Sequence, residues 1–165
     1  MVESGALHDE PVELLDGLLV HMSPQGIGHA EVIERLTRHL AVAQAWLRVQ
    51  LPLEIPPTSM PEPDLALVDR RPPGHHPNTA LLAVEVAVTS QSLDRGVKSG
   101  LYAAADIPSY WLVDVPARAI ELRTDPGLEG YRSLRVYTLG ESIPSPAPGV
   151  ADLDVSWLFK SSAPR

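Results

Sequence analysis

The stretch LLAVEVAV, residues Leu81 to Val88, decides the fold because it is an apolar run interrupted by a single carboxylate, Glu85. A run of this kind is typical of a strand that is buried on both faces of a sheet. An isolated ionised side chain in a dry interior is very unfavourable, so Glu85 is expected to be neutralised, paired or bound to a metal ion. The identity of its partner is the main question that the sequence raises.

The composition is that of an ordinary globular domain. The chain has 165 residues, of which 44% are hydrophobic and 21% are charged, and it contains no cysteine that could form disulfides or thiolate metal sites. We expect a flexible N-terminus over residues 1–10 and a single domain over residues 11–160. The first residues do not resemble a signal peptide, and no apolar run is long enough to span a membrane, so a cytoplasmic location is expected.

The charge of the chain argues against strong non-specific attraction to nucleic acid. Thirteen Lys and Arg residues stand against 21 Asp and Glu residues, which gives a formal net charge of −8. Binding to phosphates draws on clustered Lys and Arg. A DNA-binding function would therefore need a locally basic groove, although acids of an active site also contribute to the negative count.

The segments before Glu85 predict a hairpin, a helix and a strand. Asp16-Gly17 lies between two short apolar stretches, which is the pattern of a β-hairpin with a tight turn. Apolar residues then recur at steps of three and four, which predicts one amphipathic helix. Residues 64–69 and 80–88 are the two best candidates for central strands. The stripe of the expected helix consists of Ile33, Leu36, Leu40, Ala43 and Leu47.

The segments after Glu85 predict a second helix and further strands. Thr89 to Ser92 offers N-cap residues for a helix that ends at Ile107-Pro108. Its expected core stripe is Val97, Leu101 and Ala105. Strands follow over residues 110–115 and 119–123, and then come the segments 131–139 and 153–159. The result is an α/β (α+β) domain with a mixed sheet covered by helices.

Three side chains form a candidate catalytic group: Asp64, Glu85 and Lys98. If the strands that carry Asp64 and Glu85 are neighbours, the two acids meet at one edge of the sheet, and a divalent cation usually relieves their repulsion. On the following helix, Asp94, Lys98 and Tyr102 are spaced by four residues and share a face. Lys98 can then reach the acids. An aspartate, a glutamate and a lysine are the parts needed for metal-assisted phosphodiester hydrolysis.

At these residues the chain resembles the PD-(D/E)XK nucleases. More narrowly, four ordered blocks, ELLDGLLVHMSPQGIGHA, VQLP, PEPDLALV and VEVAVTSQSLDRGVKSGLYAAADIPSYWLVD, resemble the bacterial Uma-type restriction endonuclease family. The resemblance covers nearly the whole domain. It implies a restriction-endonuclease-like fold with a central mixed β-sheet flanked by helices and an N-terminal β-hairpin. It also implies cleavage of DNA that depends on Mg²⁺, with Mn²⁺ as a substitute, and a homodimer.

The resemblance assigns roles to the three candidate residues. Asp64 and Glu85 match the metal-binding acids of the family, and Lys98 matches a catalytic lysine that is displaced from the strand onto the helix. This displacement accounts for Ala87, which stands where the wider superfamily places its lysine. The endonuclease hypothesis therefore requires that the two strands and the helix bring Asp64, Glu85 and Lys98 to one place.

Three further residues match polar positions of the family with supporting roles. Gln50 is expected near the water shell of the metal or the substrate, His29 is expected as a helix cap or a substrate contact, and Asp94 has no defined role. Two positions depart from the family. Val88 stands where relatives have Asp or Ser, and Asp106 replaces a glycine.

Each candidate residue could also have a purely structural role. Asp64 follows a proline, which is common at turns, and Glu85 could pair with Arg95 or Arg118. Asp94 and Lys98 could form a surface pair at spacing i,i+4, worth about 0.2–0.5 kcal/mol. Several arginines could either line a groove for phosphates or be scattered over the surface. These are Arg70, Arg71, Arg95, Arg118 and Arg123.

Two other functions compete with the endonuclease. The negative charge and Val88 are compatible with a catalytically weakened relative that serves as a binding or regulatory module. The low content of basic residues is also compatible with a metal-dependent phosphoesterase that acts on a small substrate. The arrangement of Asp64, Glu85 and Lys98 around one cation-sized space is what separates the endonuclease from a plain α/β domain.

Overall fold

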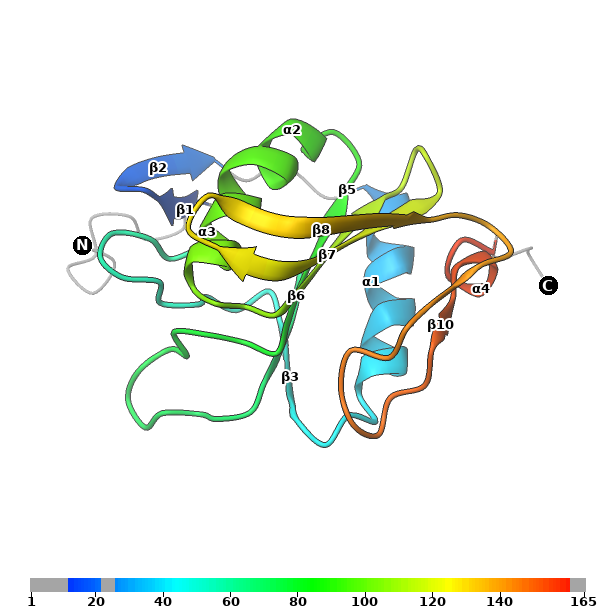
Figure 1. Ribbon diagram of the computed structural model, residues 1–165, viewed down its shortest axis with the longest axis horizontal. Coiled ribbons are helices and arrows are strands. Elements are labelled where there is room, and N and C mark those ends of the chain that lie inside the picture. Colours follow the sequence, from blue (N-terminus) through cyan, green and yellow to red (C-terminus); the bar gives the residue numbers. More distant parts are fainter. Residues whose placement is uncertain (1–11, 22–25, 161–165) are drawn as a thin grey trace.

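A six-stranded mixed sheet forms the centre of the structure, a computed structural model that describes residues 12–21 and 26–160 (Figure 1). The expected flexible N-terminus, residues 1–10, lies outside the described residues. In spatial order the sheet consists of β3 (Trp46–Val49), β4 (Leu65–Val68), β5 (Leu82–Ala87), β6 (Ser109–Asp114), β7 (Ala119–Gly127) and β8 (Gly130–Tyr137). Within this sheet β5 and β6 are parallel and the other neighbours are antiparallel.

Helices cover both faces of the sheet, which explains why β4 and β5 are apolar on both sides. On one face lie α1 (Ile27–Leu40) and α4 (Val155–Leu158), whose buried residues share a core cluster with Leu65, Leu82 and Val84. The second core cluster lies on the other face and includes buried residues of the helical segment that connects β5 to β6. In Figure 1 these two helical layers lie on opposite sides of the sheet.

The N-terminal hairpin consists of β1 (Val12–Leu15) and β2 (Leu18–His21). Asp16 and Gly17 connect the strands with positive φ angles of 48° and 80°. Two central residues with positive φ are what a type I′ turn requires, and Asp-Gly suits that turn. The predicted hairpin and the mixed sheet flanked by helices are both confirmed.

The first helix is shorter than the sequence predicted. It ends at Leu40, and Leu47, which was expected on its apolar stripe, lies instead on β3. The residues from Trp46 to Val49 pair with β4 in an antiparallel ladder. The step of four from Ala43 to Leu47 was therefore a coincidence of spacing, and pairing within the sheet decides the structure of this segment.

The helix after β5 differs from the predicted regular helix. It consists of α2 (Gln91–Leu93), a π-helical turn η1 (Asp94–Lys98) and α3 (Ser99–Ala104). The predicted core stripe is wrong at Val97, which is 44% exposed, while Leu101 and Ala105 are half-buried. The buried positions are mostly polar: Asp94, Lys98, Ser99, Tyr102 and Ala103.

The polar face of this helical segment points inward because it meets polar partners beneath it. A π turn closes its hydrogen bonds five residues apart, so it changes which side chains face the sheet, and such turns are frequent at functional sites.

At the C-terminal end of the fold, β9 (Ser142–Ile143) and β10 (Leu153–Asp154) form a small antiparallel pair before α4. Among the described residues, no helix combines the length and the apolar composition needed to cross a bilayer.

Leu36 tests the packing of α1 on the sheet. It is completely buried, so Leu36→Ala leaves a cavity and should lower the free energy of unfolding by about 2–5 kcal/mol. Leu128→Ala is the matched control, because Leu128 is 99% exposed and its loss should change stability by less than about 0.5 kcal/mol. Urea unfolding followed by circular dichroism measures both, and equal effects would contradict the described core.

Candidate functional site

The register of the strands brings three of the predicted site residues into one row. Leu65 on β4 pairs with Val84 on β5, so the next position along the same register places Asp64 opposite Glu85. On the other side of β4, Gln50 donates its backbone N–H to the carbonyl oxygen of Asp64 at 3.0 Å. Residues directly opposite each other on antiparallel strands project to the same face of a sheet. Asp64 and Glu85 therefore meet at the face covered by η1 and α3.

The carboxylate of Asp64 is fixed by groups from three elements. Its Oδ2 atom accepts a hydrogen bond from the backbone N–H of Val86 at 2.8 Å and lies 3.1 Å from Nε2 of His29. Its Oδ1 atom lies 3.5 Å from Nε2 of Gln50. An ionised carboxylate only accepts hydrogen bonds, so His29 is the donor in this contact. Asp64 therefore bonds across strands and layers and does not serve as a local turn residue.

The partner of Glu85 is Lys98. Nζ of Lys98 lies 3.1 Å from Oε1 of Glu85 and 2.9 Å from Oε1 of Glu13, and the hydroxyl of Tyr102 donates to the same Glu85 oxygen at 2.5 Å. All four residues are buried, with exposed fractions of 6% or less. One ammonium group is therefore shared by two buried carboxylates, one from the hairpin and one from the central sheet.

Burial and charge act in opposite directions on these groups. Burial raises the pKa of Glu85 well above its usual range; Lys98 opposes this, while the charges of Asp64, Asp94 and Glu13 raise the pKa further. Burial alone would lower the pKa of Lys98, but Glu85 and Glu13 more than compensate and raise it above its ordinary value. Lys98 is therefore a cation at neutral pH and is unsuited to act as a base.

Asp94 lies near this cluster without a direct bond to it. It is 2% exposed and accepts a hydrogen bond from the hydroxyl of Ser90 at 2.6 Å. Burial raises its pKa, while the hydrogen bond from Ser90 and the charge of Lys98 lower it. The alternative of a surface pair between Asp94 and Lys98 is wrong, because both side chains are buried and Ser90 is the hydrogen-bond partner.

The arginines that could have paired with Glu85 serve other contacts. Arg95 binds Asp114 at 2.8 Å and Glu121 at 2.7 Å, and Arg118 donates to the backbone oxygen of Phe159 at 2.9 Å. Neither Arg95 nor Arg118 is therefore the main partner of Glu85. Four of the five arginines considered for a phosphate groove contact acids or carbonyls elsewhere: Arg70, Arg95, Arg118 and Arg123.

Glu13 is the site residue that the sequence did not predict. Its Oε1 atom contacts Lys98, and its Oε2 atom accepts the backbone N–H of Glu62 at 3.0 Å. On β1, Glu13 alternates with half-buried apolar neighbours and shares its buried face with Leu15. An acid at a position whose alternation predicts burial, at the start of the first family-like block, is the signal that could have identified it.

The two opposed acids fit a hard divalent cation. Oxygen ligands suit Mg²⁺, which usually takes one or two protein carboxylates and completes its shell with water and substrate phosphate. In the described part of the chain, no hydrogen bond uses Oε2 of Glu85, and the shortest contact of Asp64 Oδ1 is the 3.5 Å one with Gln50. No group of three or more His, Asp or Glu side chains within that part is arranged as a complete metal site. The protein would therefore supply two ligands, Asp64 and Glu85.

Comparison with known proteins agrees with the resemblance seen in the sequence. The model of the Uma2 family, described as "Putative restriction endonuclease", matches residues 4–156. The crystal structure of "a putative nuclease belonging to DUF820" from Anabaena variabilis is similar, with a TM-score of 0.69 and 18% sequence identity over 90% of this chain and 89% of that chain. At this identity the similarity concerns the fold alone. None of the curated proteins compared with the chain matches it.

The shared lysine can be tested by its removal. Lys98→Met leaves Glu13 and Glu85 buried without their cation, and breaking a buried ion pair in this way costs about 3–5 kcal/mol at neutral pH. The pKa of Glu85 is already raised, so lowering the pH protonates it, and the deficit against the native protein should shrink as the pH falls from neutral toward the ordinary range of a carboxyl group. Urea unfolding at several pH values measures the difference.

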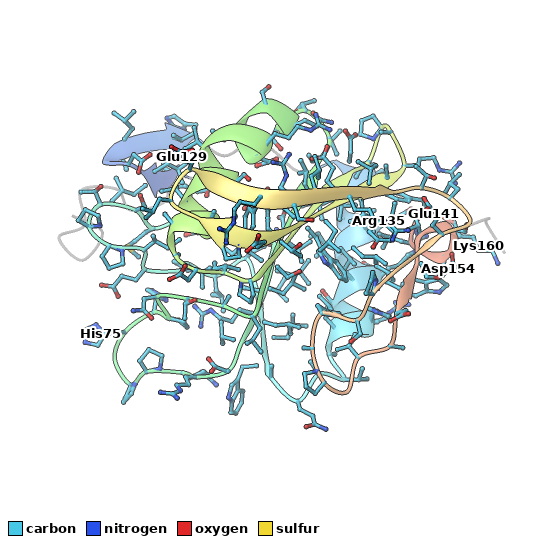
Figure 2. The ribbon with its side chains drawn as sticks, in the orientation of Figure 1. His75, Glu129, Arg135, Glu141, Asp154 and Lys160 are labelled. Carbon is cyan, nitrogen blue, oxygen red and sulfur yellow. The ribbon has the colours of Figure 1, made fainter. Side chains whose placement is uncertain are left out.

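Lys160→Met is the matched control, because Lys160 is exposed near α4 at the far end of the molecule (Figure 2). It should change stability by less than about 0.5 kcal/mol at every pH. A deficit in Lys98→Met that is small, or that stays constant as the acids are protonated, would show that the buried carboxylates do not depend on this ammonium group.

Proposed function

The chain belongs to the Uma2 family, and we propose that it is a Mg²⁺-dependent endonuclease that hydrolyses phosphodiester bonds in DNA. In this proposal Asp64 and Glu85 are the metal ligands and Lys98 is the catalytic cation. The observation that supports it most strongly is the meeting of these three groups: Asp64 lies opposite Glu85, and Lys98 lies 3.1 Å from Glu85. Mn²⁺ is expected to substitute for Mg²⁺.

The surrounding residues hold these groups in place. His29 and the N–H of Val86 fix one oxygen of Asp64, so its other oxygen keeps a defined direction. Glu13 holds the ammonium of Lys98 over the sheet edge and is a positioning residue. Such fixed charges stabilise a transition state because they need no reorganisation during the reaction.

The chemistry divides between the bound cation and Lys98. When bound, Mg²⁺ supplies Lewis-acid polarisation of the phosphate and makes water a better nucleophile at neutral pH. The protonated Lys98 faces the negative charge that develops on the phosphate oxygens in the transition state and stabilises it. Since the pKa of Lys98 is raised, this charge is present at neutral pH.

The two departures from the family do not remove any of these groups. Val88 is 40% exposed and lies just beyond β5, and Asp106 is exposed in the turn before β6. Asp106 has a φ of 53°, in the left-handed region that favours glycine and that Asp tolerates better than most residues. The replacement of a family glycine at this position therefore concerns the backbone of the turn.

A catalytically weakened binding or regulatory module is the second candidate. It is favoured by the ion pairs in which Lys98 neutralises both Glu13 and Glu85, and by the small number of metal ligands in the described residues. The two candidates differ in one measurable property, since the endonuclease must bind a divalent cation at Asp64 and Glu85. DNA as the partner and a homodimer as the assembly remain proposals that come from the family.

Cleavage is tested with isosteric variants of the two acids. Asp64→Asn and Glu85→Gln each remove one charged metal ligand and should lower the rate of Mg²⁺- or Mn²⁺-dependent cleavage by about 100-fold or more. Glu129→Gln is the matched control, since Glu129 is exposed in the turn between β7 and β8. Plasmid and single-stranded DNA serve as substrates. Inactive native protein, or full activity in Asp64→Asn, would contradict the proposal.

Binding of the cation is tested separately by thermal unfolding. Mn²⁺ at 100 times its dissociation constant stabilises a single-site protein by about 2.7 kcal/mol. For a domain of this size that corresponds to a rise in Tm of roughly 5–10 °C. The rise should disappear in Glu85→Gln and persist in Glu129→Gln. A native protein whose Tm does not respond to Mn²⁺ would favour the weakened module.

A further inference from the structure

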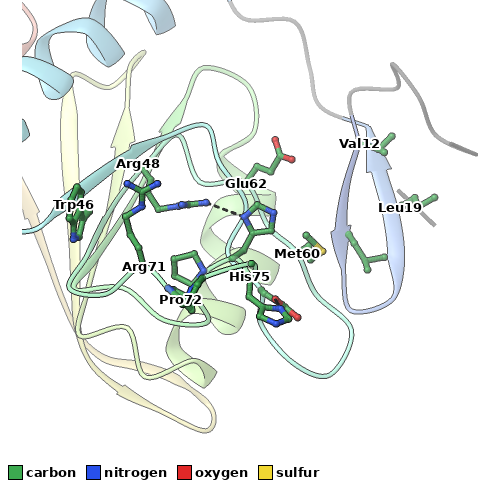
Figure 3. A pocket seen from close by; sticks show the side chains of 15 residues that line it. Val12, Leu19, Trp46, Arg48, Met60, Glu62, Arg71, Pro72 and His75 are labelled. Carbon is green, nitrogen blue, oxygen red and sulfur yellow. Dashed lines mark hydrogen bonds and ion pairs between the residues drawn. The ribbon is translucent and has the colours of Figure 1, made fainter. Parts of the chain in front are cut away.

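A cleft opens between the N-terminal hairpin and the proline-rich loop after β4 (Figure 3). Its volume is about 1020 Å³, which is the size of a pocket for a small ligand or a short segment of a polymer. The side chains that characterise it come from β3, from the loop after β4 and from the segment before β4. They are Trp46, Arg48, Met60, Glu62, Arg71 and His75.

Two arginines in this cleft, Arg48 and Arg71, have no acidic partner among the described residues. Arg48 donates to the backbone oxygen of Pro52 at 3.1 Å and lies 3.2 Å from Nδ1 of His76, and its Nε atom is buried without a hydrogen bond. In the described residues, no ion pair joins Arg48 or Arg71 to a carboxylate. Burial lowers the pKa of Arg48, and the nearby charge of Arg71 lowers it further. Two neighbouring guanidinium groups repel each other, and an anion bound between them would relieve that repulsion.

Two acids, Glu54 and Glu62, also line the cleft. Glu54 lies 4.0 Å from Nδ1 of His75, and the backbone N–H of Glu62 bonds Glu13. Burial and the charge of Glu13 raise the pKa of Glu62, while Lys98 lowers it. Through the hydrogen bond from its backbone N–H, Glu62 joins the lining of the cleft to Glu13, which in turn contacts Lys98.

Trp46 offers a flat apolar surface beside these charges. Its side chain is on an edge strand and 55% exposed, and the guanidinium of Arg71 lies 5.0 Å from the centre of its ring. Exposed indole rings next to arginines are what proteins use to stack unpaired bases of single-stranded nucleic acid. A base pair inside a duplex does not present a free face for this contact.

The cleft and the acids share one face of β3. Trp46 pairs with Val68 and Arg48 pairs with Ala66, so these two side chains lie on the same face, about 6.6 Å apart along the strand. Gln50 follows the end of β3 with a φ of 50°, and its side chain contacts Asp64, which lies on that face. These side chains therefore run from an aromatic ring through a cation to the candidate metal ligands.

We propose that this cleft binds a single-stranded segment of DNA and guides it to Asp64 and Glu85, an inference that rests on the proposed nuclease function. An unpaired base stacks on Trp46. The backbone phosphates beside it pair with Arg48 and Arg71, and the chain continues past Gln50 toward the acids. This arrangement is compatible with a net charge of −8, because the positive charge needed for binding is local and restricted to one strand of nucleic acid.

Binding is measured by fluorescence anisotropy with a labelled oligothymidylate in EDTA, so that no cleavage occurs. Trp46→Ala should weaken binding by roughly 5- to 100-fold, whereas Trp46→Phe should retain most of it. Arg48→Gln and Arg71→Gln should each weaken binding and reduce the slope of log affinity against log salt by about 0.7. The native protein should bind the single strand more tightly than a duplex of the same length.

Arg135→Gln is the matched control, because the guanidinium of Arg135 also lies over an aromatic ring, 4.4 Å from the centre of Tyr137. Figure 2 shows Arg135 at the opposite end of the molecule from His75. This variant should bind as the native protein does. Thermal unfolding of each variant checks that the fold is intact, and Trp46→Phe provides a conservative change if Trp46→Ala does not fold.

Several results would overturn the proposal. These are no binding of the oligonucleotide at low salt, unchanged binding in Arg48→Gln and Arg71→Gln, equal loss in Arg135→Gln, or tighter binding of the duplex. The test is independent of catalysis. If the cleft variants bind more weakly but the native protein never cleaves DNA, the nuclease proposal is rejected and the binding surface is retained. If the protein cleaves DNA and the cleft variants bind as the native protein does, the binding surface is rejected and the nuclease proposal is retained.

Discussion

The ion pairs of Lys98 with Glu13 and Glu85 are the interactions on which the rest of the structure depends. They answer why an apolar strand carries a carboxylate at its centre, since the ammonium offsets the cost of burying Glu85. They also connect three parts of the chain: the N-terminal hairpin, the central strand β5 and the helical segment after it. Removal of Lys98 would leave two buried carboxylates without their cation, so the hairpin is attached to the rest of the fold by electrostatics as well as by apolar contacts.

The same requirement shapes the helical segment. A regular amphipathic helix would place Val97 toward the core, but the π turn buries Asp94 and Lys98 and leaves Val97 exposed. The small side chains of Ala83 and Ala87 flank Glu85 on β5 and leave room for the lysine that reaches it. The helical segment therefore leaves Val97 exposed and buries Lys98 instead, which places the ammonium group against Glu13 and Glu85.

Sequence patterns were sufficient for the parts that are set locally or by neighbouring strands. The Asp-Gly turn and the two apolar strands follow from local patterns, whereas the meeting of Asp64 with Glu85 was expected only if the two strands were neighbours, and the observed pairing of β4 with β5 supplies that condition. Glu13 was not predicted, because the pattern of a hairpin does not say where the hairpin docks. The end of α1 at Leu40 and the π turn were also missed, since pairing within the sheet and contacts across layers decide them.

The central claim is that Asp64 and Glu85 together hold one divalent cation beside Lys98. Anomalous diffraction from crystals soaked in Mn²⁺ tests this most directly, because it locates the metal without reference to activity. The account predicts one peak within coordination distance, about 2.1 Å, of a carboxylate oxygen of each acid, with no peak in crystals of Asp64→Asn. A peak bound to other residues, or no peak between the two acids at saturating Mn²⁺, would contradict it.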